Sequence, residues 1–322
     1  MPVSELAIRT DNLSKDYAAG FWRPRPYRAL DSLNLAVETG EVFGFLGPNG
    51  AGKTTTLKLL MQLVYPTSGR AEILGRPAGD RSVRRRIGYL PENPYFYDYL
   101  TAEELLDYFA RLFGYARPDR KRRVGALLDE VGIGGERRMQ LRKFSKGMLQ
   151  RVGIAQALIN EPEVVFLDEP MSGLDPLGRR EVRNLILELR NRGCTVFFSS
   201  HVLADAEALC TRVAILAGGR LVTTGRVSDI GQFHVKGWEM VVGNVPDEAL
   251  ERCRPQAKSV VRIADRQYAF ELPDDASPER LLRELTAAGA QLISLNPLRD
   301  TLEDYFVEQL RQHPNARSVE AS

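Results

Sequence analysis

The stretch that most constrains the fold covers residues 47–55 and reads GPNGAGKTT. It fits the pattern G-x-x-x-x-G-K-[ST], a glycine-rich loop that follows a strand and opens a helix. An apolar run at 41–46 precedes it and predicts a buried strand. Behind it, apolar residues spaced i, i+3, i+4 and i+7 predict one helix face, made of Leu57, Leu60, Met61 and Val64. This context favours the motif over a glycine-rich turn that matches by chance.

The residue types in this loop suit a bound polyphosphate. Glycines let the backbone approach phosphate closely, and successive N–H groups can point inward at an anion. The following helix directs its positive end at the same place. Lys53 is placed to reach the β- and γ-phosphates, and Thr54 offers a hydroxyl to Mg²⁺. The expected phosphate-binding residues are Gly47, Pro48, Asn49, Gly50, Ala51, Gly52, Lys53, Thr54 and Thr55.

The composition allows a sizeable core and narrows the class of protein. The 322 residues, 43% of them hydrophobic, suggest roughly two domains. A net charge of +2 gives no case for a polyanion as the main partner, despite basic clusters at 81–86, 117–123 and 137–143. Three widely spaced cysteines indicate neither a disulfide framework nor a zinc site. Neither a signal peptide nor an apolar run of about 18 residues is visible, so a membrane function would need another chain.

Short apolar runs alternate with helical patterns along the first two thirds of the chain. The runs at 41–46, 163–167 and 195–199 predict buried strands, and the alternation predicts a parallel sheet covered on both faces. Ligands of such sheets bind at the carboxyl ends of the strands. The polar residues that follow the last two runs are Asp168, Glu169 and His201.

Other segments are assigned from local pattern. Residues 7–10 predict an edge strand, and 18–29, rich in proline, arginine and aromatic residues, predict a loop. A helical insert is expected at about 92–160, with a capping box at 101–104. One face of its first helix would carry Leu105, Tyr108, Phe109 and Leu112. The aromatic entrance at 95–99 fits either a groove for another protein's helix or local core packing.

The last part of the chain differs in character. From about residue 230 the patterns follow the order βαββαβ of a ferredoxin-like α+β sandwich. A further helix is expected at 301–312. We therefore assign residues 1–229 to an α/β phosphate-loop domain with a parallel-sheet core, an antiparallel edge and the helical insert. Residues 230–312 are assigned to a C-terminal accessory domain, with a flexible tail at 313–322.

Taken together, the motifs over roughly residues 5–225 resemble the nucleotide-binding subunit of ATP-binding cassette (ABC) transporters. The matching motifs are Walker A at 47–54, the signature at 144–151, Walker B at 163–168 with Glu169, the D-loop at 172–175, the switch histidine His201, the adenine-stacking Tyr17 and Glu92 at the Q-loop position. Any one of these motifs is weak, but all of them in order and spacing are highly specific.

The resemblance implies a role for each matched residue. Lys53 holds phosphate, Glu169 polarises the attacking water, and His201 contacts the γ-phosphate of ATP. Read alone, a histidine at a strand end is more often a satisfied cap, and Tyr17 can simply pack. The residues implied as Mg²⁺ ligands are Thr54, Glu92 and Asp168.

The signature motif implies a dimer. Ser145 and Gly147 begin a helix and, in this family, cap the nucleotide held by the other subunit, while Asp175 crosses the interface. The sequence departs from the family pattern at two places: FSKGM at 144–148 replaces LSGGQ, and Glu92 replaces glutamine. Both changes bear on the rate of ATP turnover and not on the fold. With these two departures, the sequence resembles the branch of the family in which the ATPase and the permease are separate chains, a branch that often consists of exporters.

The function implied is that of an ATP-hydrolysing subunit that pairs with a second nucleotide-binding subunit, expected to be another copy of this chain. It would drive export through a separate transmembrane permease at the cytoplasmic face of the cell membrane, with no nucleic-acid partner. The alternative is a soluble cassette ATPase that remodels nucleic acid or ribosomes. Such proteins usually carry two cassettes, a long coiled coil or zinc cysteines, and none of these appears in the sequence.

Overall fold

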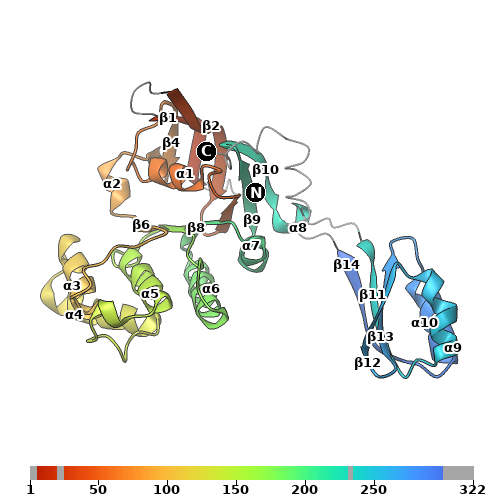
Figure 1. Cartoon of the computed structure of the whole chain (residues 1–322). Helices are drawn as coiled ribbons and strands as arrows, with labels where there is room; N and C mark the ends of the chain where they lie inside the picture. The colour runs from red at the N-terminus through yellow and green to blue at the C-terminus, as the bar shows by residue number, and fades with distance from the viewer. Residues whose placement is uncertain (1–5, 20–24, 231–234, 300–322) are drawn as a thin grey trace. The chain divides into compact units, whose positions relative to one another are not determined.

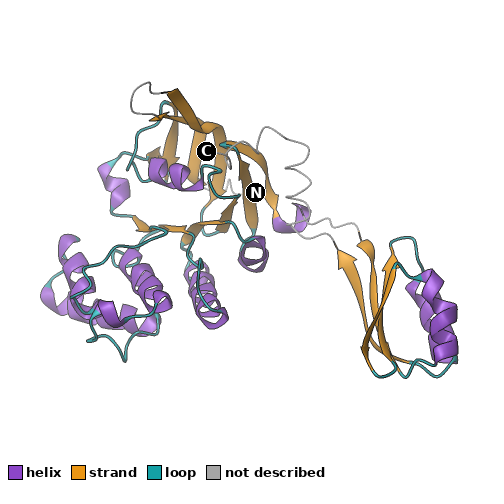
Figure 2. Cartoon of the chain, in the orientation of Figure 1, coloured by secondary structure: helices purple, strands orange, loops and turns teal. Residues whose placement is uncertain are grey.

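The computed structural model describes residues 6–19, 25–230 and 235–299. The chain divides into two compact units after Val227. Figure 1 traces the elements of each unit, and Figure 2 shows that both contain helices and strands. Within the described residues, no helix combines the length and apolar character needed to cross a membrane.

A six-stranded sheet forms the centre of the first unit, in the order β10-β9-β3-β8-β7-β6. Neighbouring strands from β9 to β6 are parallel, and β10 pairs antiparallel at one edge. Every residue of β3, β7 and β8 is buried, which explains their uninterrupted apolar runs. The predicted parallel core with an antiparallel edge is confirmed. The strands are β3 (Val42–Leu46), β6 (Ile87–Leu90), β7 (Val164–Asp168), β8 (Thr195–Ser200), β9 (Arg212–Ala217) and β10 (Arg220–Arg226).

A second, antiparallel sheet in this unit has the order β2-β1-β4-β5. Its strands are β1 (Leu6–Ala19), β2 (Arg25–Glu38), β4 (Ser68–Ile73) and β5 (Arg76–Pro77). The strand predicted at 7–10 is confirmed, but its edge position is wrong, because β1 pairs with β2 on one side and β4 on the other. The predicted loop at 18–29 is too long, because its two ends belong to β1 and β2. Repeated register shifts in β1 break the alternation that would have revealed its length.

Helices surround the sheets and form the insert. The helices of the first unit are α1 (Lys53–Leu60), α2 (Arg81–Arg84), α3 (Ala102–Leu112), α4 (Arg117–Glu130), α5 (Lys146–Ala157), α6 (Pro176–Asn191) and α7 (Leu203–Leu209), and α8 (Val227–Ile230) lies where the units divide. The capping box at the start of α3 is confirmed. Its predicted apolar face is partly wrong, since Tyr108 is 47% and Leu112 65% exposed, whereas Leu106 is buried. The buried side of α3 instead carries Ala102, Leu105, Leu106 and Ala110.

The second unit has the predicted order βαββαβ. Its four strands are antiparallel in the order β12-β13-β11-β14 and share a core with two helices. The elements are β11 (Val235–Gly243), α9 (Asp247–Cys253), β12 (Ser259–Ala264), β13 (Gln267–Pro273), α10 (Pro278–Ala287) and β14 (Gln291–Arg299). The helix expected at 301–312 and the tail at 313–322 lie outside the described residues.

Candidate nucleotide-binding site

The glycine-rich loop connects the end of β3 to the start of α1. Gly50 and Gly52 have φ of 78° and 104°, a left-handed conformation that glycine adopts at little cost. A Cβ at Gly52 would lie 2.5 Å from the Ala29 carbonyl oxygen, so the loop passes close to the backbone of β2. Gly52 is also the N-cap of α1, and as a glycine it offers no side chain to cap this helix. The first N–H groups of α1 are therefore suited to an anion.

Lys53 is folded into this loop and is only 6% exposed. Its Nζ donates to the carbonyl oxygens of Gly47 at 2.8 Å and Pro48 at 3.2 Å. The same Nζ lies 3.2 Å from Glu169 Oε1, an ion-pair distance without the geometry of a hydrogen bond. The ammonium group thus stands between the phosphate loop and the carboxylate that follows β7.

Two carboxylates follow one another at the end of β7. Asp168 Oδ1 accepts from Ser199 Oγ at 2.6 Å and from Thr54 Oγ1 at 3.4 Å. Glu169 has φ of 48°, a strained conformation that in non-glycine residues is concentrated at functional sites. Its N–H donates to Ser199 Oγ at 3.0 Å, and its Oε2 lies 2.8 Å from His201 Nδ1. The ends of β3, β7 and β8 thereby bring the predicted catalytic side chains together.

Ser199 is a site residue that the sequence did not single out. It is fully buried in β8, and its hydroxyl contacts both the Asp168 carboxylate and the Glu169 backbone. Its only signal was a polar side chain at the end of an apolar strand, two positions before His201. A buried hydroxyl of this kind fixes the orientation of its neighbours.

Asp168 fits the role of a cation ligand. Burial, reinforced by the nearby Glu169 charge, raises the pKa of its carboxyl above the ordinary value. Its Oδ2 is buried and has no hydrogen-bond partner among the residues that the structure describes. A carboxylate oxygen with no partner, beside the Thr54 hydroxyl, is the oxygen donor set that Mg²⁺ prefers. Burial of Tyr89 itself, together with the charges of Asp168 and Glu92, raises the pKa of this phenol to about 12.

Asp168→Asn is expected to stabilise the nucleotide-free protein at neutral pH. Because the folded state raises the pKa of Asp168, the carboxyl favours folding only when protonated, and this contribution is lost as pH rises above about 3.8. Asparagine removes that cost and can still accept from Ser199. Thermal unfolding with EDTA should give a higher Tm for the variant at pH 7, and a smaller difference near pH 4.5. Exposed Asp119→Asn should change Tm little at either pH.

A cavity of about 630 Å³ opens over the loop. Two of the predicted site residues, Tyr17 and Glu92, line it, together with Tyr27 and Ser172, which the sequence did not single out as site residues. Tyr17 and Tyr27 pair across β1 and β2, and Lys15 Nζ lies 5.1 Å from the Tyr17 ring centre. Two aromatic rings at the mouth of a phosphate-binding cavity suit a stacked base. The complete lining is Tyr17, Tyr27, Ala29, Asn49, Gly50, Ala51, Gly52, Lys53, Thr54, Thr55, Glu92, Glu169, Ser172 and His201.

Six predicted site residues are absent from this lining. Gly47, Pro48 and Asp168 still contact the loop through Lys53 and Thr54, whereas the other three lie at the starts of α5 and α6. Ser145 caps α5 by accepting the Met148 N–H at 3.2 Å, and Gly147 lies in the first turn of that helix. Asp175, which directly precedes Pro176, caps α6 in the same way. All three lie within the described residues and are absent from the cavity lining. Within one chain the structure therefore does not join them to the phosphate loop.

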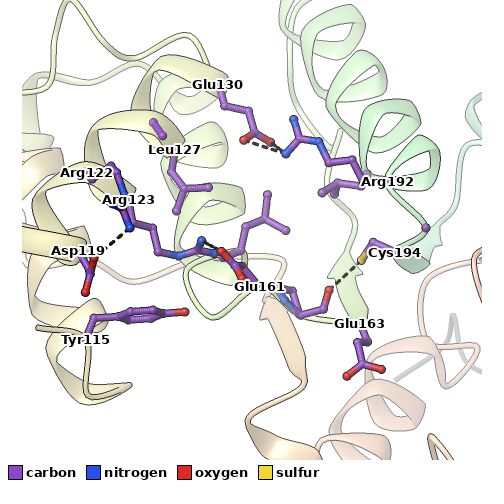
Figure 3. Close-up of a pocket in the computed structure, with 15 residues that line it drawn as sticks. Tyr115, Asp119, Arg122, Arg123, Leu127, Glu130, Glu161, Glu163, Arg192 and Cys194 are labelled. Carbon is purple, nitrogen blue, oxygen red and sulfur yellow. Dashed lines mark hydrogen bonds and ion pairs between the residues drawn. The ribbon is translucent and has the colours of Figure 1, made fainter.

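A larger cavity of about 900 Å³ lies elsewhere, between α4 and the C-terminal ends of α5 and α6 (Figure 3). Several of its charged side chains pair with one another, as Arg192 does with Glu130 at 3.1 Å, whereas Glu163 pairs with Arg86 outside the lining. Burial raises the pKa of the Cys194 thiol to about 12, so this cysteine is unreactive at neutral pH. No phosphate-loop residue lines this cavity, so its size does not make it the nucleotide site.

Comparisons with known proteins agree with this geometry. A family model described as ABC transporter matches residues 30–172. An uncharacterized ABC transporter ATP-binding protein of Synechocystis is 47% identical over 313 residues, covering 97% of this chain and 86% of its own. A fluoroquinolones export ATP-binding protein of Mycobacterium tuberculosis is 41% identical over 196 residues, covering 60% of this chain and 64% of its own.

One similar solved structure was determined after ATP hydrolysis. It is a dimeric ATP-binding cassette in a post-hydrolysis state with ADP and Pi, 26% identical with a TM-score of 0.62. The alignment covers 68% of this chain and 98% of that one. Fold, site geometry and full-length sequence similarity lead to one family. The chain belongs to the ATP-binding, ATP-hydrolysing subunits of ABC transporters.

Proposed function

We propose that this subunit drives export of a substrate through a separate transmembrane permease, which it contacts at the cytoplasmic face of the membrane. The observation that carries the proposal is the convergence of Lys53, Asp168, Glu169 and His201 at neighbouring strand ends. The export direction rests on the relative named for fluoroquinolones export. We propose residues 1–229 as the ATP-hydrolysing domain, with its helical subdomain at about 92–160, and residues 230–312 as an accessory domain.

The proposed binding step uses the cavity over the phosphate loop. The N–H groups of residues 47–55 and the Lys53 ammonium bind the β- and γ-phosphates of ATP, and Tyr17 stacks on adenine. Mg²⁺, when bound, neutralises phosphate charge as the transition state forms. Its proposed ligands are Thr54, Glu92 and Asp168.

The proposed chemical step depends on positioning. Glu169 orients a water in line with the γ-phosphate and accepts its proton, since its backbone is fixed by Ser199 and its side chain lies against His201. His201 donates a hydrogen bond to the γ-phosphate. Phosphoryl transfer needs little covalent help from the protein, so these groups are sufficient.

Subunits of this family act as dimers with permeases, and we propose a homodimer for this chain. Ser145 and Gly147 of one subunit would cap the nucleotide held by the phosphate loop of the other, and Asp175 would cross between them. Their separation from the cavity of their own chain supports this arrangement. ATP binding then closes two complete sites, and hydrolysis reopens them.

We propose the aromatic segment at 95–99 as the permease contact. Tyr95 is 94% exposed and Tyr97 53%, which is more than local packing explains. A photo-crosslinking residue at Tyr97 should capture a multi-span membrane protein in cells that co-express the neighbouring genes. The control is the same residue at Tyr65, 73% exposed beside the antiparallel sheet, which should not capture it. Capture from both positions or from neither would contradict this contact.

A further inference from the structure

The carboxylate of Asp205 is a buried charge that the hydrolysis mechanism does not use. It belongs to α7, which begins two residues after His201, and its side chain is 3% exposed. A buried carboxylate is stable only when it is paired and hydrogen-bonded. The partners of Asp205 therefore decide how α7 is held.

Both partners come from α6. Arg179 Nη2 lies 2.7 Å from Asp205 Oδ2, and Arg183 Nη2 lies 3.4 Å from Oδ1. The two arginines are four residues apart and so occupy one face of the helix. Each carboxylate oxygen thus meets a different arginine, and α7 is fixed at two points along α6.

The same α6 begins at the D-loop. Asp175 Oδ1 accepts the Gly178 N–H at 2.8 Å, and Arg179 is the next residue of that first turn. A Cβ at Gly178 would come within 2.8 Å of Asp175 Oδ1, so the cap is tightly built. Arg179 consequently joins the cap of the D-loop helix directly to the helix that follows His201.

Arg179 and Arg183 each donate from Nη2 to Asp205. Their Nε atoms are buried and have no hydrogen-bond partner within the described part of the chain. Leaving a buried donor unsatisfied is costly, and the contacts with Asp205 must offset that cost. The arrangement is therefore held by the carboxylate, and removing it frees both guanidinium groups.

We propose that Asp205 is a positioning residue. Its ion pair with Arg179, which we call the clasp, holds α7 against α6, so that His201 and Asp175 move together as one rigid unit. The inference rests on the proposed function, in which His201 contacts the γ-phosphate and Asp175 reaches the partner cassette. Loss of the γ-phosphate at His201 is then transmitted through the clasp to the dimer interface. Neither residue of the clasp touches the nucleotide cavity itself.

The test compares two buried or half-buried carboxylates that each bridge a pair of arginines. Asp205→Asn keeps the shape and removes the charge. Its matched control is Asp107→Asn, because Asp107 in the insert pairs with Arg111 at 2.9 Å and Arg120 at 2.7 Å. With the full chain and Mg-ATP, Asp205→Asn should lower kcat about tenfold with KM within about twofold, as misplacement of a catalytic group does. Asp107→Asn should keep both values within about twofold.

A double variant separates positioning from general damage. If Asp205 acts through His201, adding Asp205→Asn to His201→Ala should lower kcat less than about twofold further. Asp205→Glu should recover part of the activity, because it restores the charge. Should Asp205→Asn fail to fold, Arg179→Lys tests the same contact from its more exposed side, with an expected loss of about threefold from the weaker bond.

Two results would overturn the clasp. One is a wild-type kcat in Asp205→Asn. The other is a double variant whose loss of kcat equals the product of the losses in Asp205→Asn and His201→Ala. Failure of the proposed function has a different signature. In that case Lys53→Ala would retain wild-type hydrolysis, whereas failure of the clasp alone leaves Lys53→Ala inactive and Asp205→Asn active.

Discussion

Lys53→Ala should lower the ATPase kcat by about 10²–10³, the usual cost of removing a preorganised group that stabilises transition-state charge. The ammonium is buried within the phosphate loop, held by the Gly47 and Pro48 carbonyl oxygens and 3.2 Å from Glu169. Alanine removes the one side-chain cation of the loop at 47–55. Phosphate release from purified protein with Mg-ATP measures the effect directly.

The control for this variant lies on the same helix. Lys58 is exposed near the end of α1, so Lys58→Ala changes the charge of the chain equally but should retain activity. Turnover of Lys53→Ala within about threefold of wild type would contradict the assigned site, because charge neutralisation dominates phosphoryl transfer. Thermal unfolding of both variants shows whether any loss of activity reflects a loss of folding.

The parts of the fold that could be predicted from the sequence are those with strong local patterns. Strands β3, β7 and β8 are buried on both faces, so their composition alone identifies them. The long strands β1 and β2 were only partly recognised, since register shifts interrupt their alternation and Pro26 resembles a loop signal. β2 lies at the edge of its sheet, where a proline costs no ladder hydrogen bond.

The site follows the same division. The phosphate loop, Asp168, Glu169 and His201 were predicted because each sits at a strand end within a motif, and parallel topology places such ends together. Ser199 was missed because its role depends on a hydrogen bond to Asp168, 31 positions away on another strand. Tyr27 was missed because it fell in the predicted loop at 18–29, which concealed its pairing with Tyr17. The buried Asp205 was missed for a similar reason, because its two arginines lie 22 and 26 positions away along the chain.

Glu169→Gln should trap a dimer that holds ATP. The substitution keeps the size of the side chain and can keep a hydrogen bond to His201, but it cannot accept a proton from water. Binding would therefore survive while hydrolysis falls by at least the 10²-fold typical of general-base removal. The neutral side chain also leaves Lys53 without its carboxylate, which favours a bound phosphate as the alternative partner of that cation.

Size-exclusion chromatography with Mg-ATP should show the Glu169→Gln protein as a dimer and the nucleotide-free protein as a monomer. The matched control is Glu163→Gln, which lies just before the same strand β7 but at its opposite end, where the carboxylate is 52% exposed and pairs with Arg86. That variant should hydrolyse ATP and form no lasting dimer. A Glu169→Gln protein that binds ATP yet stays monomeric would show that the two phosphate loops are not closed by a second subunit. Ser145, Gly147 and Asp175 would then need another role, because none of them lines the cavity of its own chain.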